Sequence, residues 1–172
     1  QANAIKAKIE QFACVEETLT GYDSGLLPKN MMMSFGIAEW EGKPEEMKNF
    51  DIEVMHVGKT FCEFYHLQLV EGDWWEGNAS NGDCLDVLVN ESAAKKMRFY
   101  EPIGKKIMGL DKTMFRIIGV VKDFHTSPPT VPVQPLLFLG GDDVSYVSMN
   151  MCFVIRYHPG QRKELKAKVD EL

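Results

Sequence analysis

The two ends of the chain share one hydrophobic pattern. Apolar residues recur at positions i, i+4 and i+7 in residues 2–12 and again in residues 161–172, among mostly charged neighbours. This spacing predicts a short amphipathic helix at each end. The apolar positions are Ile5, Ile9, Phe12, Leu165, Val169 and Leu172. We expect both helices to lie on one face of the same sheet, with these side chains buried against it.

Strand-like patterns fill most of the chain between these helices. Period-two alternation or a continuous apolar run indicates strands at residues 14–19, 31–40, 50–57, 84–89, 105–108, 115–121 and 147–157. Short helices are expected at residues 60–67 and 91–97, with Asn90 as the N-cap of the second. Turn-forming residues indicate loops at 21–30 and 72–83, and four prolines make residues 127–135 a rigid connector. The mixture predicts an α+β fold.

Composition narrows the class of protein. The 172 residues include 19 Lys+Arg against 25 Asp+Glu, a net charge of -6, and 45% are hydrophobic. This is a globular, soluble composition, and without a basic patch it argues against nucleic acid and anionic lipid as partners. The longest nearly apolar stretch, residues 131–139, contains two prolines and is too short to span a membrane. Because the chain opens with Gln1 and no leader-like segment, we expect it to be a piece excised from a longer protein.

Motifs for catalysis and phosphate binding are incomplete. Residues 104–106 (GKK) lack both the earlier glycine and the following Ser/Thr of a phosphate loop. Ser24 lies one place late for a nucleophile elbow. Asp123 and His125, two apart on an extended segment, could share a proton or a cation, although a hydrogen-bonded structural histidine explains the pair without a third ligand. We therefore expect no catalytic centre, metal or cofactor. The rival hypothesis is a free-standing periplasmic enzyme or metal-binding protein that uses this pair.

Cysteine and tryptophan leave two further questions open. The four cysteines, Cys14, Cys62, Cys84 and Cys152, match no zinc or C-x-x-C spacing. They are either small buried residues or include one disulfide, and we expect at most one disulfide to form. Trp74 and Trp75 form either an exposed contact for a partner protein or a pair in which one ring caps the core and the other lies on the surface.

Two longer stretches carry a family resemblance. The first comprises residues 89–97 (VNESAAKKM) and 101–107 (EPIGKKI), and the second comprises residues 115–125 (FRIIGVVKDFH) and 135–138 (PLLF). Together they resemble the periplasmic core domain of MacB/FtsX-like ABC transporter permeases, especially the Bacteroidetes group. Residues 60–74 are similar to the family's phenylalanine-rich helix and the turn after it, but Asp73 and Trp74 depart from its G-R-x-F pattern.

The resemblance implies an architecture and a function. A porter-like α/β subdomain, residues 1–72 and 141–172, would carry an inserted, smaller, mainly β, Sabre-like subdomain at residues 73–140. Such a domain stands in the periplasm between the first two membrane helices of a permease in the bacterial inner membrane. A separate cytoplasmic ATPase would drive it, a second permease subunit would pair with it, and a periplasmic protein could join them. The family exports peptides, drugs or lipoproteins, or transports nothing and transmits force.

Overall fold

A computed structural model describes residues 2–22, 32–76, 80–81, 83–126, 128, 130–140 and 151–172. Its helices are α1 (Ala2–Ile9), α2 (Lys59–Phe64), α3 (Glu91–Lys96) and α4 (Arg162–Asp170). Its strands are β1 (Val15–Tyr22), β2 (Met32–Trp40), β3 (Phe50–His56), β4 (Leu69–Gly72), β5 (Ser80–Asn81), β6 (Cys84–Asn90), β7 (Lys106–Gly109), β8 (Met114–Val121), β9 (Leu136–Leu139) and β10 (Met151–Tyr157). The predicted α+β class is confirmed.

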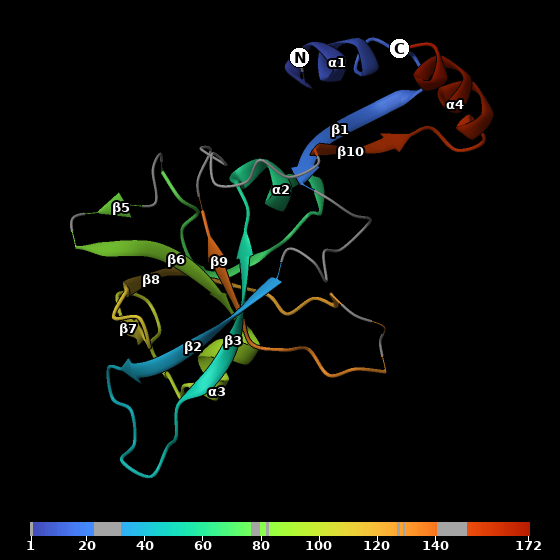
Figure 1. Ribbon diagram of the computed structural model, residues 1–172. Coiled ribbons are helices and arrows are strands. Elements are labelled where there is room, and N and C mark those ends of the chain that lie inside the picture. Colours follow the sequence, from blue (N-terminus) through green and yellow to red (C-terminus); the bar gives the residue numbers. More distant parts are fainter. Residues whose placement is uncertain are drawn as a thin grey trace. The chain divides into compact units, whose positions relative to one another are not determined.

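The chain forms two compact units (Figure 1). Unit 1 comprises Gln1–Leu26 and Val147–Leu172, and unit 2 comprises Leu27–Tyr146. Unit 2 is therefore inserted into unit 1. The strands within residues 32–72, which the sequence analysis expected in the porter-like part, pair inside unit 2. The hydrophobic pattern of a strand does not identify the strand with which it pairs.

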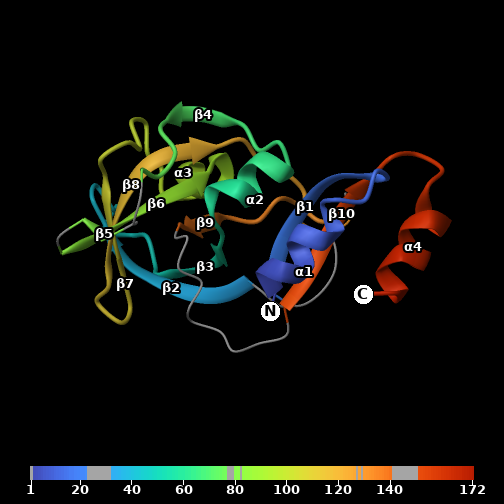
Figure 2. The same cartoon turned by 90° about the horizontal axis from the view of Figure 1, so that it is seen from above.

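Unit 1 is built on an antiparallel ladder between β1 and β10 (Figure 1). The ladder runs from the pair Val15 and Tyr157 to the pair Tyr22 and Met151, with a bulge before Glu17. Helix α1 precedes β1 and packs against it (Figure 2), and α4 follows β10. An isolated two-stranded ladder is marginally stable in water, so unit 1 depends on the apolar residues of its helices.

Each terminal helix of unit 1 buries one large side chain. Ile9 is 2% exposed and Leu165 is 8% exposed. The predicted burial of the whole stripes is wrong, since Ile5 (40%), Val169 (37%) and Leu172 (46%) are largely exposed. Two strands offer too little surface to bury more than one turn of each short helix. A cation–π contact joins the helical regions, with Lys168 Nζ 5.6 Å from the ring centroid of Phe12.

Unit 2 contains an eight-stranded sheet in the order β4-β8-β7-β2-β3-β9-β6-β5, with a further parallel pairing between β6 and β8. This pairing closes β2, β3, β9, β6, β8 and β7 into a ring. Along one edge, β8 pairs with β7 near Phe115 and with β4 near Val120. Strand β6 is shared in the same way between β9 and β5. Closure removes the long free edges that the six strands would otherwise expose.

Two hydrophobic clusters lie on opposite faces of the central strands. Alternate residues of β6 divide between them, because Val87 and Val89 belong to the first cluster and Leu88 to the second. The first cluster includes Ala93 and Ala94 of α3, and the second includes Cys62 of α2. Strands covered on both faces explain the near-continuous apolar runs in the sequence. These clusters form the core of unit 2.

Asn90 connects three segments at the end of β6. Its side chain is fully buried and caps α3, as predicted, by accepting a hydrogen bond from the Ala93 amide (2.9 Å). The same oxygen accepts from the Leu136 amide (2.8 Å), and the side-chain nitrogen donates to the Gln134 carbonyl (2.9 Å). One side chain thus joins β6, α3 and the start of β9. The proline-rich connector ends at this point, so Asn90 also fixes where the chain re-enters the sheet.

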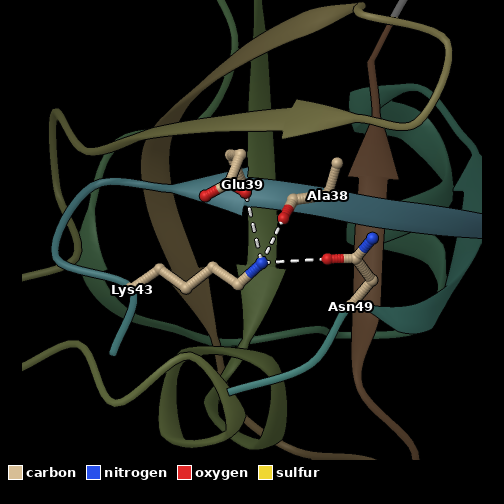
Figure 3. A network of polar contacts seen from close by, with 4 residues as sticks. All are labelled: Ala38, Glu39, Lys43 and Asn49. Carbon is tan, nitrogen blue, oxygen red and sulfur yellow. Dashed lines mark hydrogen bonds and ion pairs between the residues drawn. The ribbon is translucent and has the colours of Figure 1, made fainter. Parts of the chain in front are cut away.

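Lys43 holds the connection between β2 and β3 (Figure 3). Its ammonium donates to the Ala38 carbonyl (2.5 Å) and to Asn49 Oδ1 (2.9 Å), and it lies 3.3 Å from Glu39 Oε1. Its side chain is only 12% exposed, and the ammonium lies 5.1 Å from the ring centroid of Trp40. Several acceptors converge on one donor, which pins an otherwise irregular segment to the strand before it.

Replacing Asn90 by Ala should lower the free energy of unfolding by about 3 kcal/mol, because three buried hydrogen bonds are lost and two buried amides are left unpaired. Asn49→Ala, which removes one exposed hydrogen bond, is the matched control and should cost less than about 1 kcal/mol. Urea unfolding followed by circular dichroism measures both values. Equal losses in the two variants would contradict the connecting role of Asn90.

Ile9→Asp should lower the melting temperature by about 10 °C, since it removes roughly 2 kcal/mol of burial and places an unpaired charge in an apolar site. The same change at Ile5, which is 40% exposed, should have a small effect. Thermal unfolding of the two variants tests whether α1 is firmly packed. An unchanged melting temperature for Ile9→Asp would show that α1 is a loose tether.

Candidate functional site

Asp123 acts as a structural acceptor next to α3. Its carboxylate accepts hydrogen bonds from the Ser92 amide (3.0 Å) and the Ser92 hydroxyl (2.6 Å), one on each oxygen. Its own amide donates to Glu91 Oε2 at 2.9 Å. These reciprocal bonds tie the segment after β8 to the first turn of α3. Both oxygens of the carboxylate are therefore already engaged.

His125, two residues further on, is exposed. The described residues contain no group of three or more His, Cys, Asp or Glu side chains arranged to hold a metal ion. The rival hypothesis of an enzyme or metal-binding protein built on Asp123 and His125 therefore gains no support from this geometry. Asp123 is better explained by its structural role, because it attaches the segment after β8 to α3.

Trp74 and Trp75 divide between the surface and the core. Trp75 is 8% exposed, and its indole nitrogen donates to the Asp86 carbonyl at 3.0 Å. Its ring lies so close to Gly140 that a Cβ there would stand 2.2 Å from a ring carbon. Trp74 is partly exposed and packs at the edge of the second cluster. One indole ring therefore lies in the core, and the other lies at the surface.

A shallow hollow lies between the β2–β3 turn and the segment after α3. Its volume is about 350 Å³, and its rim includes Tyr100, which is 97% exposed. One ion pair lies on the rim: Lys105 Nζ lies 2.7 Å from Glu41 Oε1, and this hydrogen bond lowers the pKa of Glu41. Sequence reasoning missed the hollow, because its lining residues are separated by more than fifty positions.

Three cysteines are free thiols. Cys14 and Cys62 are buried, and Cys84 is half-buried. Burial raises the pKa of the Cys62 thiol to about 12, with a smaller contribution from the charge of Glu63. The side chain of Cys152 lies outside the described part of the chain. The observed thiols agree with the expectation of at most one disulfide.

No protein-family model matches the chain, and no curated protein matches it by sequence. Several solved structures are similar in fold, and three of them illustrate the match. The periplasmic region of MacB from Actinobacillus actinomycetemcomitans superposes with a TM-score of 0.60 at 15% identity, covering 98% of this chain and 71% of its own. The extracellular domain of the noncanonic ABC-type transporter YknZ from Gram-positive bacteria gives 0.61 at 10% identity, with coverage of 98% and 79%. A domain of a putative permease protein from Porphyromonas gingivalis gives 0.55 at 17% identity, with coverage of 90% and 66%.

The chain has the fold of these extracytoplasmic domains. The family resemblance drawn from the sequence is confirmed at this level, over nearly the whole chain and across both units. Within the described residues, no helix is long and apolar enough to cross a membrane. At such low sequence identity the fold is shared, but individual binding residues are not thereby assigned.

At pH 8, iodoacetamide should label Cys84 much faster than Cys62 in the folded protein. A thiol with a pKa of about 12 holds roughly one thiolate in 10,000 at that pH, and only the thiolate reacts. Peptide mass spectrometry against labelling time gives both rates, and guanidinium should make them similar. Rapid labelling of Cys62 under native conditions would contradict the burial of its thiol.

Proposed function

We propose that the chain is the periplasmic domain of an ABC transporter permease subunit of the MacB/FtsX type, held in the bacterial inner membrane by helices outside this sequence. The observation that carries the proposal is the match in fold to transporter and permease domains over 90–98% of the chain. The motifs that carry the family resemblance lie in unit 2, whereas the similarity in fold extends over both units. Two independent lines therefore support the same family.

The topology supports a role in coupling. Both ends of the chain belong to unit 1, and unit 2 is inserted between β1 and β10. Any membrane segment joined to either end would act first on α1 or α4. Ile9 and Leu165 fix these helices to unit 1, so a displacement of the ends would move the ladder as well. We propose that a cytoplasmic ATPase drives this displacement for export or for transmission of force to a periplasmic protein.

The domain itself is proposed to have no catalytic role. Asp123 is engaged by Ser92, and Glu41 on the rim of the hollow is paired with Lys105. In this proposal a separate cytoplasmic subunit hydrolyses ATP. Two permease subunits together form the working transporter.

The parent protein tests this function directly. Its sequence should contain one apolar segment of about 20 residues before Gln1 and three after Leu172. An epitope inserted after Gly42, in the exposed β2–β3 turn, should be protected from protease in intact cells and cleaved in spheroplasts. The detergent-solubilised protein should copurify with an ATP-hydrolysing subunit.

A cytoplasmic tag without the epitope serves as the control for cell integrity, because it should stay protected in spheroplasts. Cleavage of the epitope only after cell lysis would place the domain in the cytoplasm and refute the proposal. A parent protein released entirely into the soluble periplasmic fraction would instead favour the free-standing alternative.

A further inference from the structure

The acidic excess of the protein is confined to unit 2. Residues 27–146 hold 18 Asp+Glu against 12 Lys+Arg, whereas the remainder of the chain holds seven of each. Within unit 2 the imbalance is concentrated further, because residues 60–94 contain seven acidic residues and no Lys or Arg. A partner that approaches this part of unit 2 meets a negative potential.

Some of these acidic side chains have structural partners. Asp86 forms a bidentate ion pair with Arg116, and both nitrogen–oxygen distances are 2.8 Å. Glu63 lies 3.9 Å from Lys59, and Glu91 accepts the amide of Asp123. Glu71, Asp73 and Glu76 differ from them, because all three are exposed and have no such contact among the described residues. These three carboxylates lie on one short stretch of chain.

That stretch lies at an edge of the sheet. Strand β4 ends the strand order of the unit 2 sheet and pairs only with β8 in the described part of the chain. Val70 on this strand is 55% exposed, and Ile103, which lies against Gly72, is 37% exposed. Trp74 follows directly, partly exposed beside the fully packed Trp75. We name residues 70–76 the acidic edge. Apolar and aromatic side chains surrounded by charge are typical of a docking surface.

The charge of the acidic edge determines which kind of partner can bind there. A second copy of this chain would place like charges opposite one another, which disfavours pairing through this edge. A basic segment would meet three exposed carboxylates and a partly exposed indole ring, whose face attracts cations. We propose that the acidic edge binds a Lys/Arg-containing segment of a protein partner, with one cation over Trp74 and others paired with Glu71, Asp73 and Glu76. The proposal depends on the proposed function in one respect only, because it assumes that the partner lies outside the membrane.

Titration of the 172-residue chain with a short blocked peptide that alternates glycine and arginine tests this site. Amide and indole signals of residues 70–76 should shift first in heteronuclear NMR spectra at low salt. The variant Glu71→Gln, Asp73→Asn, Glu76→Gln should weaken binding about tenfold, as expected for the loss of three exposed charge pairs. These isosteric changes of exposed groups leave the fold intact.

The matched control removes the same charges elsewhere in unit 2. Glu45→Gln, Asp51→Asn, Glu101→Gln changes three exposed acidic residues and should leave binding within about twofold of the parent chain. Equal weakening by both triple variants, shifts spread over the whole of unit 2, or no binding at low salt would each overturn the proposal. A dimer abolished by the first variant would assign the edge to a second copy instead. None of these results depends on the protease test of location.

Discussion

The ladder between β1 and β10 is the interaction on which the architecture depends. It pairs residues 15–22 with residues 151–157, so about 130 residues lie between the strands that it joins. Closing an unstructured loop of that length costs on the order of 4 kcal/mol, and a two-stranded ladder alone is marginal. The burial of Ile9 and Leu165 supplies the additional stability.

Unit 2, in contrast to unit 1, has an extensive core of its own. Its ring of strands is covered on both faces, and Asn90 satisfies backbone groups from three segments at the one place where a helix, a strand end and the connector meet. A rigid inserted unit with a self-contained core can change its position without changing its shape. The arrangement suits a domain that is moved by its ends and presents a surface, such as the acidic edge, to another protein.

Local patterns predicted most elements because their causes are local. Alternation located β3, a continuous apolar run located β8, and Asn90 was identified as the cap of α3. The shorter strands β4, β5 and β9 were missed, since two to four residues carry too little periodicity. The subdomain boundaries depend on pairings such as Ile37 with Gly109, which no local pattern encodes. The role of Asp123 was equally hidden, because its partner Ser92 lies 31 positions earlier.

The most direct test of the account is a disulfide across the ladder in the full-length permease that we propose. Thr20 and Phe153 are direct partners, a separation that a disulfide between cysteines at these positions can span. In a background with the native cysteines replaced by alanine, the oxidised transporter should hydrolyse ATP as fast as the reduced one, because β1 and β10 move as a single body. If oxidation abolishes ATP hydrolysis and reduction restores it, the strands must separate during the cycle, and β1 and β10 do not move as a single body.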